Sequence, residues 1–405
     1  HNKAQIGGSS FSNGAIYLSP LLGPLDIQNP LYENGALINT PYASILYEEY
    51  FSKQYSHNYI AEVVLKPVKG LVIKSQNSSN NSTLYKYHAW PSTMPKKDPK
   101  EGADATKYEK EYHKLASENT ITYKPTLPRG NFFDIMAGFS VSSYKYNYNT
   151  LTAKGLLEDN FKWNNFGGIG SKENYTISSS TSKTIKESVF GRINYNYQGR
   201  YYFTATVRGD GSSNFAANHK WGFFPSGAFK WNVKGENFMR AVKSVNQLEL
   251  RIGAGRTGND AISAYESLQA YGITTSGYIF DGAQGASFYP SRLDNPNLTW
   301  EKTDEYNVAI EGSFLKNRVS FNFEAYYART TDLLLKVPVN RVTGYTSYLD
   351  NLGETSNRGV ELTIDSKNVE TKRFGWSTAF TISHNRQKVL NIGGESYVST
   401  VTSPG

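Results

Sequence analysis

One segment, residues 188–232, constrains the fold of this chain more than any other because its apolar and polar residues alternate with a period of two. Val189 and Ile193 fall on one face of an extended chain, and Arg192 and Asn194 fall on the other. The same alternation resumes after the next turn. Successive side chains of a strand point to opposite faces, so the two faces meet different media. The apolar face packs on a second sheet in a soluble sandwich, whereas it faces lipid in an outer-membrane barrel.

The amino-acid composition favours a membrane protein over a soluble one. Aromatic residues make up 14% of the chain, with 30 Tyr against 21 Phe and 6 Trp, and tyrosine suits positions where apolar and aqueous surroundings meet. Hydrophobic residues make up only 38%, and no apolar run approaches the roughly 18 residues of a membrane-spanning helix. A membrane protein of this composition must cross with strands, since only every second residue of a strand faces lipid.

About twelve strands are expected from the period-two pattern. Many of them are long, and roughly 11 residues tilted by about 45° cover the apolar band of about 25 Å in an outer membrane. The expected strands are residues 58–66, 70–76, 120–127, 132–146, 187–197, 201–208, 221–233, 247–255, 304–314, 318–328, 358–366 and 374–384.

Short turns alternate with long polar segments between these strands. The long segments are residues 77–119, 147–183, 257–302 and 330–357. Such alternation places the long loops on one edge of the sheet, which is typical of barrels with short periplasmic turns and long extracellular loops. The sequence therefore predicts an all-β fold, an antiparallel transmembrane β-barrel.

The charged and reactive residues exclude several functions. The formal net charge is +8, but the basic residues are scattered, so anionic lipid head groups are the expected partners and nucleic acid is not. The chain has no Cys, and its six His are dispersed without metal-ligand spacing. There is no nucleophile elbow or phosphate-binding loop. The chain is therefore predicted not to be an enzyme and to carry no metal or cofactor.

Several motifs occur in a fixed order along the chain. They are SVFGRINY at 188–195, YYFTATVRGDGSSNF at 201–215, WGFFPS at 221–226, LRIGAGRTGN at 250–259, NPNLTWEKT at 295–303 and NRGVEL at 357–362. With these motifs the sequence resembles the SusC/RagA-type TonB-dependent outer-membrane transporters.

The resemblance implies a multi-pass barrel of 22 strands in the outer membrane of a Gram-negative bacterium, plugged by an N-terminal domain. Residues 1–405 are then expected to be a partial barrel domain with about 12 of the 22 strands, the plug domain and the C-terminal strands lying outside it. The implied partners are a SusD-like lid lipoprotein, the TonB complex acting through the missing N-terminal region, and outer-membrane lipid and lipopolysaccharide. A dimer of transporter–lid pairs is a further expectation. The implied function is import of oligosaccharides or peptides.

Aromatic residues in the long polar segments are the candidate contacts with substrate or lid. Such rings can stack on sugar faces, with neighbouring polar groups as hydrogen-bond partners, or they can pack the loops against one another or against the lid. The candidates are Trp90, Trp163, Phe166, Tyr278, Phe288 and Tyr289. Trp231 and Trp376 lie near short turns and are predicted to belong to the periplasmic aromatic girdle.

Two other classes of protein fit the pattern. A surface adhesin or glycan-binding β-protein without transport would also carry long polar loops. A closed twelve-stranded barrel, either a porin or an enzyme-bearing barrel, is the other alternative. The absence of a Ser/His/Asp or paired-carboxylate constellation argues against the enzyme. The transported substrate is not specified by the sequence.

Overall fold

The computed structural model describes residues 47–93, 102–128, 130–169, 174–280 and 283–392, with the backbone alone for 275–280 and 283–284. Within these residues the chain is mostly strand: one sheet has twelve strands and two further sheets have two strands each. Its helical elements are single 3₁₀ turns, and none of the described helices could span a membrane.

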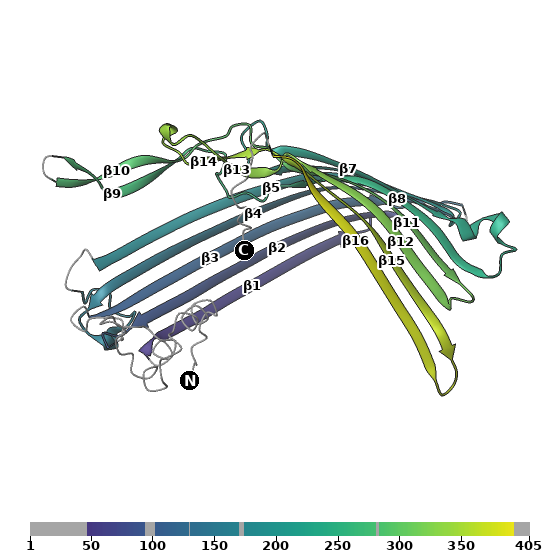
Figure 1. Ribbon diagram of the computed structural model, residues 1–405, viewed down its shortest axis with the longest axis horizontal. Coiled ribbons are helices and arrows are strands. Elements are labelled where there is room, and N and C mark those ends of the chain that lie inside the picture. Colours follow the sequence, from purple (N-terminus) through teal and green to yellow (C-terminus); the bar gives the residue numbers. More distant parts are fainter. Residues whose placement is uncertain (1–46, 94–101, 129, 170–173, 281–282, 393–405) are drawn as a thin grey trace. The chain divides into compact units, whose positions relative to one another are not determined.

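The strands of the large sheet lie side by side in chain order (Figure 1). Each overlaps one of the twelve expected segments, so their number and order are confirmed. The strands are β1 (Glu49–Leu65), β2 (Leu71–Trp90), β3 (Ala103–Tyr123), β4 (Asn131–Leu156), β5 (Tyr175–Tyr197), β6 (Tyr201–Ser212), β7 (Trp221–Asn232), β8 (Val245–Asn259), β11 (Glu301–Phe314), β12 (Val319–Thr331), β15 (Glu354–Glu370) and β16 (Gly375–Asn391).

The first two predicted long loops are wrong in extent. Strands β2 and β3 fill most of residues 77–119, and β4 and β5 extend far into residues 147–183. These extensions are polar, so the apolar alternation ends although the ladder of backbone hydrogen bonds continues. A ladder requires paired backbones and no particular medium on its faces, so a strand can extend beyond the residues that show apolar alternation.

The other two predicted loops contain short antiparallel ribbons. Residues 257–302 include β9 (Ala270–Phe280) and β10 (Ala283–Arg292), and residues 330–357 include β13 (Leu334–Pro338) and β14 (Ser347–Asn351). The large sheet therefore passes directly from β8 to β11 and from β12 to β15.

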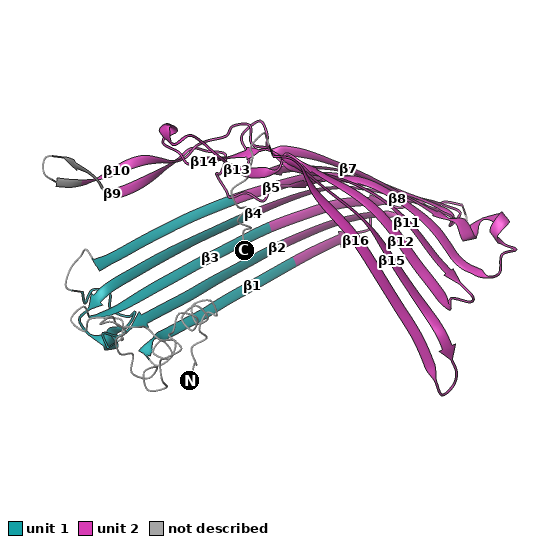
Figure 2. Cartoon of the chain, in the orientation of Figure 1, with its two compact units in different colours: residues 1–60, 78–115, 143–183 teal, residues 61–77, 116–142, 184–405 magenta. Residues whose placement is uncertain are grey.

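The chain forms two compact units (Figure 2). Unit 1 comprises residues 1–60, 78–115 and 143–183, and unit 2 comprises residues 61–77, 116–142 and 184–405.

The two faces of the sheet in unit 2 differ as the alternation predicts. One face is polar, with ion pairs such as Arg251–Glu311 at 2.6 Å and the hydrogen bond from Asn194 to Asp134 at 2.8 Å. The opposite face exposes large apolar side chains row after row, which indicates contact with lipid. These side chains include Val189, Ile193, Phe203, Val207, Ile252, Tyr306, Val308, Ile310, Phe323, Tyr327, Val360, Phe380 and Ile382.

A small buried core anchors the connections of unit 2 to its strands. Phe215, Phe224, Leu298 and Trp300 are almost fully buried, and the Trp300 ring lies 5.3 Å from that of Phe215 and 5.4 Å from that of Phe224. The Trp300 indole N–H also donates to the carbonyl of Lys220 at 2.9 Å. The NPNLTW motif therefore fixes the chain against β7 just before β11 begins.

At the short-turn edge of unit 2, the buried carboxylate of Glu236 joins two connections. It accepts hydrogen bonds from the Tyr201 hydroxyl at 2.5 Å, the Trp231 indole N–H at 3.1 Å and the Arg200 guanidinium at 2.9 Å. Glu236 lies between the 3₁₀ turns η4 (Val233–Gly235) and η5 (Asn237–Met239), whereas Arg200 belongs to the β5–β6 turn. These donors, Tyr201 first, lower the pKa of the Glu236 carboxyl below its usual value.

Trp376, the other tryptophan predicted to belong to the periplasmic aromatic girdle, is exposed.

The lowered pKa of Glu236 predicts how stability depends on pH. A carboxyl whose pKa is depressed by folding stabilises the folded state above its unfolded pKa of about 4.3, and this contribution disappears as the pH falls through the lower folded value. Glu236→Gln in the full-length protein should therefore lower the temperature of unfolding at pH 7, and the difference from wild type should shrink below about pH 4. Heat-modifiable gel mobility measures this. Glu370→Gln, at an exposed position beside the β15–β16 turn, is the control and should unfold at the same temperature as wild type at every pH. An effect of Glu236→Gln that did not depend on pH would contradict the prediction.

Adjacent residues of β15 test which face meets lipid. Leu362 lies opposite Phe323 and Ile382 on the apolar face, and Thr363 follows it on the polar face. Leu362→Arg should reduce the free energy of unfolding by about 2–4 kcal/mol because an arginine then faces the hydrocarbon. Thr363→Arg should change it little, as measured by urea titration of the full-length protein in detergent. Equal losses in the two variants would contradict the assignment of faces.

Candidate functional site

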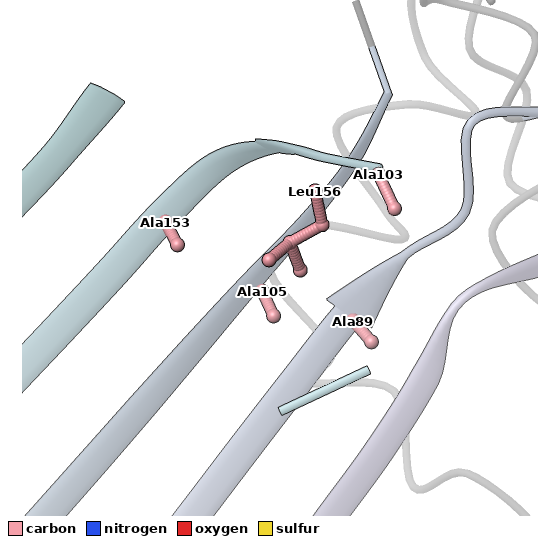
Figure 3. Close-up of a cluster of buried hydrophobic side chains, with 5 residues drawn as sticks. All are labelled: Ala89, Ala103, Ala105, Ala153 and Leu156. Atoms are coloured by element: carbon pink, nitrogen blue, oxygen red, sulfur yellow. The ribbon is translucent and has the colours of Figure 1, made fainter. Parts of the chain in front are cut away.

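In unit 1, four alanines form a floor on one face of the sheet. Ala89 is the residue before the end of β2, Ala103 and Ala105 begin β3, and Ala153 lies near the end of β4, where Leu156 completes the buried cluster (Figure 3). Methyl side chains leave room for another segment to approach the sheet closely. Residues 157–169 use this room, because Trp163, Phe166 and Ile169 pack against the cluster.

Polar contacts hold this covering segment in place. It begins with the 3₁₀ turn η2 (Asp159–Phe161), and the Asp159 carboxylate accepts hydrogen bonds from the Ser92 backbone N–H at 2.7 Å and from the Ser92 hydroxyl at 3.0 Å. Lys162 pairs with Glu49 at 2.6 Å, and the Leu157 N–H donates to the Gly168 carbonyl at 3.0 Å. The segment is therefore fastened to β1, to the end of β2 and to itself.

An aromatic cluster forms where this segment meets the strands. The Trp163 ring lies 5.9 Å from Tyr87 and 6.4 Å from Phe51, and the latter two rings stack at 5.4 Å. The Lys107 ammonium lies 5.3 Å from the centre of the Tyr87 ring and 5.8 Å from that of Phe166, within the range of cation–π attraction. Trp163 and Phe166 are thus brought together, half-buried, in one cluster.

A polar groove of about 450 Å³ lies in the same unit. It is lined by one aromatic ring and by hydroxyl, amide and carboxylate groups, a set suited to a ligand rich in hydrogen-bonding groups. The lining residues are Thr83, Tyr85, Glu109, Glu111, Asn147, Asn149, Ser179, Ser180 and Thr181. The ring of Tyr85 lies 6.1 Å from that of Tyr87, so the groove continues the aromatic cluster.

Tyr87 adjoins the groove and is itself protonated at neutral pH. It lies near the far end of β2, beyond the roughly 11 residues that can cross a bilayer. Its hydroxyl donates to Glu109 at 2.9 Å, and burial together with this hydrogen bond raises the pKa of Tyr87 to about 12. Tyr87 therefore remains a hydrogen-bond donor at neutral pH, and it occupies one oxygen of Glu109.

The other predicted contacts lie elsewhere. Trp90 ends β2, with its ring 3.8 Å from that of His88. Phe288 and Tyr289 lie on the β9–β10 ribbon of unit 2, where they are 73% and 49% exposed. The backbone of Tyr278 pairs with Gly285 in the same ribbon, and the Tyr278 side chain lies outside the described residues.

The ribbon carries a larger apolar surface than the sequence analysis anticipated. Tyr271 and Ile273 are 61% and 64% exposed, and Ile273 pairs directly with Phe288. The Tyr289 ring lies so close to Gly272 that a methyl group there would approach it to 2.4 Å. Glycine is therefore required at position 272 for this arrangement.

Two residues of the unit 1 cluster, Phe51 and Lys107, were missed in the sequence. Phe51, Tyr55 and Tyr59 are aromatic residues four apart, which places them on one face of a strand and could have revealed that β1 begins before residue 58. Lys107 lies in the polar extension of β3 and gave no such signal. Among the residues that the structure describes, no group of His, Asp or Glu could hold a metal ion.

The sequence matches the family model described as TonB dependent receptor-like, beta-barrel, over residues 5–402. It is 31% identical over 407 residues to TonB-dependent receptor P3 of Formosa agariphila, covering 98% of this chain and 40% of that one. It is 36% identical over 211 residues to TonB-dependent receptor SusC of Bacteroides thetaiotaomicron, covering 51% and 21%. A solved structure of the RagAB peptide transporter superposes with a TM-score of 0.78 at 23% identity, covering 89% and 40%. The chain spans about two fifths of the length of P3.

Asp159 is predicted to control how tightly the covering segment is closed. Asp159→Ala removes both hydrogen bonds from Ser92, and a bond to a charged group contributes about 2 kcal/mol. Trypsin should then cleave after Lys162 roughly thirtyfold faster in the full-length protein, because cleavage requires local opening. Glu158→Ala is the matched control, since the Glu158 carboxylate accepts a hydrogen bond from nearby Asn160 within the same segment. Equal cleavage of the two variants would show that Asp159 does not hold the segment.

Proposed function

The chain belongs to the TonB dependent receptor-like β-barrel family, and from this premise we propose that it is the central barrel part of a SusC-like outer-membrane importer. The family consists of outer-membrane transport proteins and not of enzymes, so the chain lies in the outer membrane. The observation that carries the proposal is the sheet of unit 2, with one face exposing large apolar side chains and the other lined by ion pairs and amides. Such a wall separates lipid from a polar passage.

The proposed cargo is an oligosaccharide or a peptide. Support comes from the similarity to SusC over half of the chain and from the polar groove of unit 1, which offers carboxylate, amide and hydroxyl groups beside an aromatic ring. Both kinds of cargo present many hydrogen-bonding groups. The half-buried Trp163 and Phe166 would shape the wall beside this groove. Import in this mechanism is binding followed by gated passage, without bond chemistry.

A SusD-like lipoprotein is the proposed partner at the extracellular edge, and the TonB complex the proposed source of energy through parts of the protein outside this chain. The β9–β10 ribbon is the proposed lid contact. Its exposed Tyr271, Ile273 and Phe288 form an apolar surface of the kind that protein partners cover, and Tyr289 is exposed on the opposite face of the ribbon. Tyr278 extends the same ribbon.

Growth and uptake test the transport function. A strain lacking the full-length protein should fail to grow on one class of oligosaccharide or peptide as its carbon source, and the wild-type gene should restore growth and uptake of a fluorescent derivative. Binding of that substrate at the cell surface with no loss of growth on deletion would contradict transport and favour the surface adhesin.

Substitution of the ribbon tests the proposed lid contact. Ile273→Ser with Phe288→Ser, two paired residues on one face of the ribbon, should weaken co-purification of a lipoprotein with the full-length protein in mild detergent by about thirtyfold, the effect of losing one interfacial hot spot of about 2 kcal/mol. Val342→Ser is the matched control, because Val342 is also highly exposed but lies on the 3₁₀ turn η6 (Arg341–Thr343) between β13 and β14. Unchanged recovery of the lipoprotein with the ribbon variant would remove the ribbon from the interface.

A further inference from the structure

A belt of cations lies on the lipid-facing side of unit 2, just beyond its apolar rows. Pairing of β11, β12, β15 and β16 fixes which side chains share a row on that face. From the short turns outward, successive rows are Ile310, Phe323, Leu362 and Ile382; then Val308, Ala325, Val360 and His384; then Tyr306, Tyr327, Arg358 and Arg386. The third row is thus half aromatic and half cationic.

The next row outward is charged across four strands. Asp304 lies opposite Arg256 on β8 and opposite Arg329 on β12, and beyond Arg329 the row continues to Ser356 and Lys388. The Arg256 guanidinium binds both oxygens of Asp304, at 2.7 and 2.8 Å. Arg329 binds Glu354 at 2.5 Å. These two carboxylates are therefore already engaged, and farther out Lys302 pairs with Asp332 at 2.9 Å without adding net charge.

Three cations of the belt have no such partner. Within the described part of the chain, the side chains of Arg358, Arg386 and Lys388 make no ion pair or hydrogen bond, although Arg358 and Arg386 lie directly opposite each other. Two like charges side by side are unfavourable unless an anion lies between them. Among the described strands, the belt therefore carries an excess of positive charge on β15 and β16.

The height of the belt corresponds to lipid head groups. Eight residues separate Phe314, beside the short turn, from Tyr306. This length is about 26 Å along the strand and roughly 19 Å across the membrane at a tilt of about 45°, so the cations lie near the outer border of an apolar band of about 25 Å. Tyr306 and Tyr327 are exposed at this border, as expected for an aromatic girdle.

We propose that Arg358 and Arg386, assisted by Lys388, bind the phosphate groups of a lipopolysaccharide molecule in the outer leaflet. The lipid A head group of lipopolysaccharide places phosphates at this depth, and a guanidinium binds phosphate through two parallel hydrogen bonds. The acyl chains would lie along Val360 and Ile382, below the arginines on the same face. The paired Arg256 and Arg329 close the belt on the side of β8 and β12. The site rests on the outer-membrane location and not on the identity of the cargo.

Binding of defined lipids by the full-length protein in detergent tests this site. Native mass spectrometry should show retained lipid A bearing both phosphates and about thirtyfold weaker retention by Arg358→Gln with Arg386→Gln, roughly fivefold for each arginine. Arg192→Gln is the matched control, because Arg192 lies on the polar face of β5. Arg358→Lys with Arg386→Lys should bind with intermediate strength, since the charge remains and the guanidinium fork is lost.

The chemistry of the lipid distinguishes the possible sources of anion. Dephosphorylated lipid A should not be retained, and phosphatidylglycerol should not compete with the phosphorylated form. Equal retention by the glutamine variant and wild type, retention of dephosphorylated lipid A, or full competition by phosphatidylglycerol would each overturn the proposal. Heat-modifiable mobility verifies that every variant is folded, and lipid retention is read independently of uptake, so failure of either proposal leaves the other testable.

Discussion

The backbone hydrogen-bond ladder is the interaction on which the structure depends. Lipid offers no partner to a backbone N–H or C=O group, so a strand that crosses a membrane must be paired on both sides. The strands of the large sheet pair in the order in which they occur in the sequence. The two ribbons, β9–β10 and β13–β14, do not belong to this sheet, so β8 pairs with β11 and β12 pairs with β15. With the ladder continuous, the side chains only have to satisfy the medium on each face, and a period of two is sufficient for this.

Because only the faces of the strands depend on their surroundings, some parts of the fold can be predicted from the sequence and others cannot. Where one face meets lipid and the other a polar interior, the alternation is strong, and all twelve strands were predicted in order. Where both faces are polar, as in the outer part of β2 with its run of Asn and Ser, the ladder persists without a compositional signal. The extensions of β2 to β5 were therefore interpreted as loops.

The candidate site was predictable only in part, for a related reason. Aromatic residues in polar segments are conspicuous, so Trp163 and Phe166 were singled out, and the structure places both on the alanine floor of unit 1. Their partners are not conspicuous. Alanines at positions 89, 103, 105 and 153 are widely separated in the sequence, and only the register of three strands brings them together as a surface on which a loop can lie. A local sequence pattern shows which residues share one face of a single strand. It does not show which residues of different strands lie side by side, because that depends on the register between the strands.

Arginine serves two purposes in unit 2, and the difference lies in where its countercharge comes from. Arg251 and Arg256 are each matched by a carboxylate on the neighbouring strand β11, so the sheet itself neutralises them and their geometry is fixed by the ladder. Arg358 and Arg386 face each other across β15 and β16, and the described part of their row holds no carboxylate. If the wall needed only polar side chains at this depth, paired charges such as Arg256 and Asp304 would be sufficient. Arg358 and Arg386 lie instead beside exposed apolar rows on the same face. This arrangement is complementary to a lipid with an anionic head group, so the period-two pattern that defines the lipid-facing side also places the groups that would bind that lipid.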